Sequence, residues 1–277
     1  MIIAGAASGA PSPGGRGRGE RPAPFYLARD TEVAVFEQCH ARGLPVLLQG
    51  PTGCGKTRFV EHMAWRLGRP LVTVACHDDL SATDLTGRYL VVNGETVWRD
   101  GPLTTAARQG AICYLDELVE ARSDTIVVIH PLADHRRVLP IDKTGELVEA
   151  APGFQLVISY NPAYQQLLKE LKPSTRQRFV SIEFGLPQPE AERAIVAHEA
   201  EVPEATAAAL VELAARLRRL DAHGLAEVPS TRLLIAAARL IGAGIPPREA
   251  CRAALVAPLS DDAELLAAMN ALVTASF

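Results

Sequence analysis

The chain has 277 residues, of which 48% are hydrophobic and 22% are charged, and its formal net charge is −4 at pH 7. This length allows one large domain, or a medium domain with a smaller one, and either arrangement can bury a sizeable core. The slightly acidic balance disfavours nucleic acid or an anionic membrane as a partner, because both are bound by basic surfaces.

Cysteine spacing and the length of apolar segments indicate in which cellular compartment a protein resides. The five cysteines are far apart and include no C-x-x-C pair, so they indicate neither a disulfide framework nor a zinc site, and the histidines show no metal-ligand spacing. No apolar run approaches the ~18 residues of a membrane span. Residues 1–7 lack the basic start of a signal peptide. We therefore expect reduced cysteines, a cytoplasmic location and no membrane insertion.

Residues 1–24 are rich in Gly, Pro, Ser and Arg and contain little that could be buried, which predicts a disordered tail. Order is expected to begin at Phe25. Asp30 and Thr31 predict the cap of a helix that Gly43 ends, and a strand follows from Pro45 to Gln49.

The stretch from Leu47 to Thr57 is an apolar strand that runs into a Gly-x-x-x-x-Gly-Lys-Thr loop, with a helical pattern behind it at 58–67. Glycines let backbone N–H groups surround a phosphate, and the helix directs its positive end at the same anion. Lys56 would reach the β- and γ-phosphates, and the Thr57 hydroxyl would ligate Mg²⁺. The predicted ATP-binding loop comprises Gly50, Pro51, Thr52, Gly53, Cys54, Gly55, Lys56 and Thr57.

A second apolar, β-branched strand covers 70–76, and the alternation of such strands with helices predicts a parallel sheet covered on both faces. A hairpin follows, because Asn93-Gly94 separates two β-rich arms over 89–98. Tyr89 and Trp98 on these arms could serve packing or a partner contact. A second hairpin is predicted at 136–149, with its turn at 142–145.

The stretch from Ala111 to Glu117 has buried-strand character and ends in two carboxylates, the Walker B arrangement. In this arrangement Asp116 would hold Mg²⁺ through water. Glu117 would orient and deprotonate the water that attacks the γ-phosphate.

Three more polar positions follow. Asn161 ends the strand 154–160, where it could position the attacking water or serve only as a turn residue before a proline. Arg176 and Arg178 precede the strand 179–184. They are either surface charge or a finger that reaches the γ-phosphate of a neighbouring subunit.

A Pro-Gln-Pro linker at 187–189 precedes an Ala/Leu-rich region without strand patterns. Ser230 and Thr231 predict the cap of a helix over 233–241. Arg232 at the start of that helix opposes the helix dipole, so an external anion is a reasonable partner for it. The sequence thus predicts an α/β fold: a P-loop core with a parallel sheet and two hairpin inserts at 25–186, followed by a small all-α lid domain at 187–277.

Taken together, the loop at 50–57, the strand 112–117, Asn161, the arginines and the helical region resemble the AAA+ ATPases. The two hairpins, with Asp84-Leu85-Thr86-Gly87 and Asp100-Gly101-Pro102-Leu103, resemble the MoxR branch. The stretches 50–60, 112–117 and 172–179 are similar to the CbbQ/NirQ/NorQ group. The resemblance covers about residues 25–277.

This resemblance implies a homo-oligomeric ring, typically a hexamer, that hydrolyses ATP and acts with a von Willebrand factor A-domain partner to remodel a client metalloenzyme. Nitric oxide reductase is the favoured client and Rubisco is a close second. The resemblance also implies that Asn161 is sensor 1, Arg178 rather than Arg176 is the finger, and Arg232 is sensor 2. The chain lacks the aromatic-hydrophobic-Gly tripeptide of pore loops, which favours force transmitted through the partner or the hairpins over threading.

Two other functions are compatible with a P-loop. A small-molecule kinase would use the helical region as a substrate lid, but a water-activating Glu117 would waste ATP in such an enzyme. A DNA-acting AAA+ protein is the other alternative, and the acidic balance disfavours it.

Overall fold

The computed structural model describes residues 22–162, 171–220 and 228–277. The expected tail at 1–24 lies almost entirely outside the described residues. The chain divides into two compact units. The first unit extends to Phe184 without the loop Pro51–Gly55, and the second contains that loop together with Gly185–Phe277.

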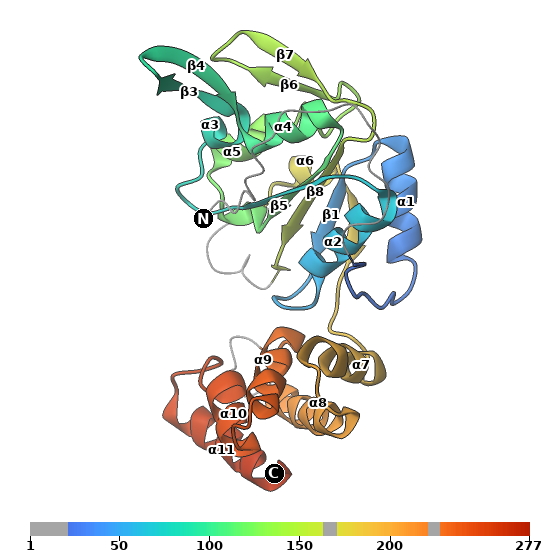
Figure 1. The fold of residues 1–277 in the computed structure, drawn as a ribbon, viewed down its shortest axis with the longest axis vertical. Coiled ribbons are helices and arrows are strands. Elements are labelled where there is room, and N and C mark those ends of the chain that lie inside the picture. Colours follow the sequence, from blue (N-terminus) through green and yellow to red (C-terminus); the bar gives the residue numbers. More distant parts are fainter. Residues whose placement is uncertain (1–21, 163–170, 221–227) are drawn as a thin grey trace. The chain divides into compact units, whose positions relative to one another are not determined.

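The first unit is built on a five-stranded sheet whose paired strands are all parallel, as predicted (Figure 1). Its spatial order is β2-β5-β8-β1-β9. The strands are β1 (Val46–Gln49), β2 (Leu71–Ala75), β5 (Ile112–Asp116), β8 (Gln155–Tyr160) and β9 (Val180–Glu183). β8 is buried at every position, because it lies in the middle of the sheet.

Alternate side chains of each strand point to opposite faces of the sheet. On one face, Leu47, Leu115 and Ile158 belong to a cluster that includes α4 (Pro102–Gln109). The intervening strand residues lie outside this cluster, on the face that carries α2 (Lys56–Leu67). Phe59 of α2 meets Phe36 of α1 (Glu32–Arg42) edge to face, with ring centroids 5.4 Å apart. Tyr114 and Ser159 therefore lie on the α2 side of the sheet.

The start of α1 differs from the prediction. Thr31 precedes the helix but its side chain makes no capping hydrogen bond. Instead, the Glu32 carboxylate accepts from the amides of Arg29 and Asp30 and from the Tyr26 hydroxyl. Burial alone would raise the pKa of Glu32, but these hydrogen bonds outweigh it and lower the pKa. Gly43 ends the helix in the left-handed conformation, as expected.

The first hairpin pairs β3 (Gly87–Val92) with β4 (Glu95–Asp100). Asn93 and Gly94 at its turn have φ of 53° and 83°, the left-handed values that a tight hairpin turn requires. The short helix α3 (Ala82–Thr86) precedes it and begins with a capping box between Ser81 and Asp84.

The second hairpin pairs β6 (Val138–Ile141) with β7 (Glu146–Glu149), after the helix α5 (Ser123–Val128). Arg137 anchors its base. The guanidinium donates to the carbonyl of Gly43 and, at 2.9 Å, to that of Phe154. Both hairpins predicted from the sequence are therefore present.

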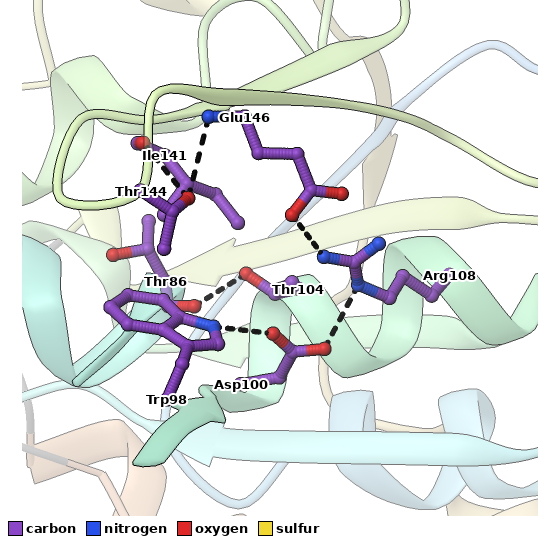
Figure 2. Close-up of polar contacts among 8 residues, drawn as sticks. All are labelled: Thr86, Trp98, Asp100, Thr104, Arg108, Ile141, Thr144 and Glu146. Atoms are coloured by element: carbon purple, nitrogen blue, oxygen red, sulfur yellow. Dashed lines mark hydrogen bonds and ion pairs between the residues drawn. The ribbon is translucent and has the colours of Figure 1, made fainter. Parts of the chain in front are cut away.

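Side chains of the helix α4 form hydrogen bonds and ion pairs with both hairpins (Figure 2). The Arg108 guanidinium donates to Asp100 of β4 at 2.9 Å and to Glu146 of β7 at 2.7 Å. Asp100 also accepts from the Trp98 indole at 2.8 Å, and Thr104 donates to the carbonyl of Thr86 at 2.6 Å. Trp98 therefore serves packing, whereas Tyr89 is 50% exposed.

Beyond Gly185 the described residues form helices and no strand. These are α7 (Pro189–Ala200), α8 (Glu204–Arg218), α9 (Thr231–Gly242), α10 (Pro247–Cys251), a π-helical turn (Arg252–Val256) and α11 (Ala263–Ser276). Their apolar faces share one buried cluster. The observed architecture is thus the predicted α/β core followed by an all-α region.

All five cysteines are buried and unpaired, as expected. Across the described parts of the chain, no group of three or more His, Cys, Asp or Glu side chains is arranged to hold a metal ion. None of the helices in these parts combines the length and the apolar character that a membrane crossing needs.

Candidate nucleotide-binding site

The predicted motifs meet at one edge of the sheet. β5, β8 and β1 are neighbours and run parallel, so their carboxyl ends lie at the same edge. The loop 50–57 follows β1, Asp116 and Glu117 end β5, and Asn161 follows β8. In an open α/β sheet this edge is where ligands bind.

The loop 50–57 depends on close backbone approach at its first glycine. A Cβ atom on Gly50 would lie 2.0 Å from the carbonyl oxygen of Phe184. Lys56 is buried and is the first residue of α2, two positions before the predicted start. Its Nζ donates to the Gly50 carbonyl at 2.7 Å, so the backbone of the first loop residue holds the ammonium group.

Thr57 and Asp116 bring two oxygen ligands together. The Thr57 hydroxyl donates to Asp116 Oδ2 at 3.4 Å. A hydroxyl beside a carboxylate oxygen is a donor set that suits Mg²⁺, which prefers hard oxygen ligands and retains several waters. The side chains present therefore fit the metal that the motif implies.

Asp116 is held by two further hydroxyls, both on the α2 face of the sheet. Tyr114 Oη donates to Asp116 Oδ1 at 2.6 Å, and Ser159 Oγ donates to the same oxygen at 2.5 Å. Burial, followed by the charge of Asp116, raises the pKa of Tyr114 far above its usual range, so the phenol remains a protonated donor. In the described parts of the chain, the side-chain donors to this carboxylate are therefore all hydroxyls, which orient it without an ion pair.

Glu117 makes the turn out of β5. Its φ and ψ of 55° and 48° are left-handed, a conformation rare for a residue with a side chain, and the 3₁₀ turn Leu118–Glu120 begins directly after it. Its amide donates to Ser159 Oγ at 3.0 Å. The side chain is exposed, where a nucleotide could reach it. Nearby, burial and the charges of Asp116 and Glu117 raise the pKa of Cys76 to about 12, so this thiol stays neutral.

Asn161 is buried, with 5% of its surface exposed. It lies directly beyond β8, between the strand that precedes the loop and the strand that carries Asp116. The structure therefore places Asn161 at the carboxyl edge of the sheet, as the sequence predicted.

The two candidate finger arginines lie elsewhere in the first unit. α6 (Pro173–Arg176) carries Arg176 at its last residue, and this side chain is exposed. Arg178 Nη1 donates to the carbonyl of Ser174. Its Nε is buried and has no hydrogen-bond partner in the described parts of the chain.

Arg232 lies in the first turn of α9 and is exposed. Within the second unit, a Cβ atom on Gly53 would lie 2.5 Å from Ser230 Oγ and 3.2 Å from Arg232 Cβ. The left-handed φ of 72° at Gly53 and this crowding both require glycine. The start of α9 therefore borders the loop.

The predicted cap of α9 is partly wrong. Ser230 occupies the N-cap position but its side chain makes no capping hydrogen bond. The Thr231 hydroxyl turns instead to the buried Glu192, to which it donates at 2.7 Å. Arg218 forms a two-bond ion pair with the same carboxylate, with both bonds at 2.8 Å, and also donates to the Pro229 carbonyl.

Sequence reasoning missed Tyr114, Ser159 and the Glu192–Arg218 pair. A signal for the first two was present. Ser159 is a hydroxyl residue in a buried strand that is mostly apolar. Tyr114 precedes Asp116 by two positions, so Tyr114 and Asp116 lie on the same face of the strand. No comparable signal marks Glu192 and Arg218, because the two lie 26 positions apart on different helices.

Comparison with known proteins agrees with this geometry. Residues 45–179 match a family model described as an AAA domain of the dynein-related subfamily, and residues 192–276 match one described as the CbbQ/NirQ/NorQ C-terminal region. The chain is 60% identical to Protein NorQ of Paracoccus denitrificans over 95% of this chain and 97% of the relative. It is 58% identical to Protein CbbQ of Hydrogenophilus thermoluteolus, over 93% and 96%.

A third relative, the denitrification regulatory protein NirQ of Stutzerimonas stutzeri, is 59% identical over 94% of each chain. In fold, the chain is similar to a RuvB variant from Thermotoga maritima, with a TM-score of 0.53, 14% identity and coverage of 85% of this chain and 66% of the other. The chain therefore belongs to the CbbQ/NirQ/NorQ family, and with its AAA domain it is an ATPase that hydrolyses ATP.

Proposed function

We propose that the chain is an ATP-driven remodelling protein, and that the strand-end site described above uses Mg²⁺-ATP. The observation that carries the proposal is the approach of Thr57 to the hydrogen-bonded Asp116, directly beside Glu117. In this proposal the loop 50–57 binds the phosphates, with Lys56 moving from the Gly50 carbonyl to the β- and γ-phosphates. Bound Mg²⁺ would neutralise charge that develops on the phosphates.

The remaining roles follow from the side chains. Glu117 accepts a proton from the attacking water, and Asn161 orients that water. Arg232 contacts the bound nucleotide from the start of α9. We take 25–186 as the ATPase core and 187–277 as the lid, a proposal supported by the division of the chain between Phe184 and Gly185.

We further propose that the site is completed between subunits of a homo-oligomeric ring, with six subunits. The argument rests on Arg178. Its guanidinium donates to the Ser174 carbonyl, and its Nε is buried without a partner in the described residues. A guanidinium with an unused donor is available to the γ-phosphate of a neighbour. Arg176, which is exposed, is the second candidate.

As working partners we propose an adaptor with a von Willebrand factor A domain and a client metalloenzyme. Relatives carrying the NorQ and NirQ names, one of them called a denitrification regulatory protein, favour nitric oxide reductase as the client. The CbbQ relative has nearly the same identity and supports Rubisco as the second candidate. The exposed apolar side chains of the β3–β4 hairpin, such as Val91 at 77%, offer a surface through which force could reach a partner.

Mixing two inactive variants tests the shared site. Arg178→Ala should lower ATP turnover about 10³- to 10⁵-fold, the effect typical of a missing arginine finger, and should leave nucleotide binding intact. Glu117→Gln should also be inactive. Mixed rings should regain part of the turnover, because Arg178 of one variant meets Glu117 of the other. The shared site is refuted if Arg178→Ala hydrolyses ATP normally as an isolated subunit.

The client is tested by reconstitution. The wild-type protein and the adaptor, supplied with ATP, should raise the activity of purified inactive nitric oxide reductase, and Glu117→Gln should not. Activation of inhibited Rubisco alone would instead select the second client. Phosphate transfer to a metabolite without release of free phosphate would establish a kinase, and salt-sensitive DNA binding would establish a DNA-acting protein.

A further inference from the structure

The hydroxyl of Ser159 lies where two functional residues meet. The register of β5 and β8 pairs Tyr114 with Val157 and Leu115 with Ile158, so the next position places Asp116 beside Ser159 on the same face. Ser159 is completely buried. Its Oγ lies 2.5 Å from Asp116 Oδ1 and 3.0 Å from the amide nitrogen of Glu117.

The directions of these two hydrogen bonds are fixed by chemistry. A backbone amide can only donate, so Ser159 Oγ accepts from Glu117. A serine hydroxyl has one proton, and the remaining contact uses it to donate to the carboxylate of Asp116. One buried hydroxyl therefore links the metal-side carboxylate to the backbone of the residue that would activate water.

The strain at Glu117 makes this link consequential. Its left-handed backbone, with φ of 55°, is unfavourable for a residue with a Cβ and persists only where its surroundings impose it. The hydrogen bond to Ser159 fixes the peptide plane before this turn. The direction in which the Glu117 side chain leaves the strand depends on that plane.

Tyr114 performs only one of the two tasks. Its hydroxyl donates to Asp116 Oδ1 and makes no hydrogen bond to the Glu117 amide. With Oδ1 occupied by Tyr114 and Ser159, the second oxygen, Oδ2, is directed at the Thr57 hydroxyl. The two donors thus select the carboxylate oxygen that is presented on the metal side.

We propose that Ser159 is a positioning residue that sets both Asp116 and Glu117, and that Tyr114 assists it at Asp116 alone. This inference rests on the proposed roles of those two carboxylates. It predicts that the two hydroxyls can be separated by experiment, since loss of Ser159 disturbs the water-activating side chain and the metal-side carboxylate together. Loss of Tyr114 disturbs the carboxylate and the Thr57 hydroxyl, which lies 3.5 Å from Tyr114 Oη, and leaves the hydrogen bond to the Glu117 amide in place.

The test compares Ser159→Ala and Tyr114→Phe with Thr104→Val as a control. Thr104 is likewise fully buried and its hydroxyl makes one hydrogen bond, to the Thr86 carbonyl, away from the sheet edge (Figure 2). The first measurements are kcat and KM for ATP. The affinity for a fluorescent ADP is then measured at increasing Mg²⁺, which gives the Mg²⁺ concentration at which half of the increase in affinity is reached. The thermal unfolding midpoint is measured for each variant.

Ser159→Ala should lower kcat about 10- to 100-fold, the scale of a hydrogen bond to a charged group, with little change in KM. It should also raise the half-saturating Mg²⁺ concentration several-fold. Tyr114→Phe should produce the Mg²⁺ shift with a smaller loss of kcat. Ser159→Thr, which keeps the hydroxyl, should recover part of the turnover, and Thr104→Val should change neither kinetic quantity.

Three results would overturn the inference. They are wild-type kcat and Mg²⁺ dependence in Ser159→Ala, an equal loss in Thr104→Val, and identical kcat losses in Ser159→Ala and Tyr114→Phe. Failure of the inference is distinguishable from failure of the proposed site. If Glu117→Gln is inactive while Ser159→Ala is normal, only the positioning role fails, and if Glu117→Gln turns over normally, the proposed site itself fails.

Discussion

Two hydrogen-bonded carboxylates, one in each unit, are held in opposite ways. Within the described residues, Asp116 receives its side-chain hydrogen bonds from the hydroxyls of Tyr114, Ser159 and Thr57, none of which carries a charge. Glu192 is fully buried and receives a two-bond ion pair from Arg218. The first carboxylate is oriented but not neutralised, whereas the second is neutralised within the protein.

This difference separates function from stability. Neutral donors fix the geometry of a carboxylate and leave its charge available to a cation, which suits a metal-side ligand. A buried ion pair has its charge compensated already, and removal of one partner leaves an isolated buried charge. Changes at the sheet edge should therefore affect turnover, and changes at the Glu192 pair should affect folding.

The largest expected effect is on turnover. Glu117→Gln should lower the ATP hydrolysis rate about 10²- to 10⁴-fold, because a general base is lost. Nucleotide binding and the thermal unfolding midpoint should remain close to wild type, since Glu117 is exposed. Phosphate release and calorimetry measure the two properties. Glu149→Gln, an exposed carboxylate on β7, is the matched control. A large drop in unfolding midpoint would contradict the comparison.

The next effect is on stability. Arg218→Met should destabilise the helical region by about 3–5 kcal/mol, because Glu192 is left buried without its partner. The double variant with Glu192→Leu should regain much of that loss. Denaturant unfolding measures both, and a double-mutant cycle isolates the pair. If Arg218→Met has the same free energy of unfolding as the wild type, the ion pair between Glu192 and Arg218 does not stabilise the fold.

A smaller effect is expected at the bridge between the hairpins. Arg108→Gln removes ion pairs to Asp100 and Glu146 that are partly exposed, so it should cost no more than about 1 kcal/mol (Figure 2). Hydrogen exchange should accelerate in β6–β7 while the central sheet is unaffected. Global destabilisation of several kcal/mol would show that this ion-pair network resembles the Glu192 pair instead.

The smallest effect concerns Glu32, a third carboxylate, whose donors are two amides and the Tyr26 hydroxyl. Despite burial, these hydrogen bonds hold its pKa below the ordinary glutamate value of 4.5. Its contribution to stability is therefore present above pH 4.5 and is lost as pH falls through the lower, folded-state value. Between pH 6 and pH 3, the thermal unfolding midpoint should fall less steeply in Glu32→Gln than in the wild type. The same pH dependence in both proteins would refute a lowered pKa for Glu32.

The motifs could be predicted from the sequence because each one consists of residues close together in the chain. Glycines around a phosphate, Asn93-Gly94 at a turn and carboxylates at a strand end all act over a few residues. Sequence patterns therefore predicted the parallel sheet and both hairpins. The position of Lys56 in the loop could be read in the same way.

The parts that were missed depend on contacts between distant residues. The Asp116–Ser159 hydrogen bond joins two strands, and the Glu192–Arg218 pair joins two helices. At the start of α1, a cap was predicted from Asp30 and Thr31, but the carboxylate of Glu32 turned back to the preceding amides instead. Local propensity could not rank these competing acceptors, because all of them lie within three consecutive residues of the same turn.

The central claim is that Asp116, which is oriented by hydroxyls and not by a cationic side chain, serves a cation bound with the nucleotide. Fluorescent ADP affinity measured across a Mg²⁺ titration tests this most directly in wild-type protein and Asp116→Asn. The account predicts that Mg²⁺ tightens binding in the wild type and has no such effect in Asp116→Asn, with equal affinities when Mg²⁺ is absent. An Asp116→Asn protein that responds to Mg²⁺ as the wild type does would contradict the account.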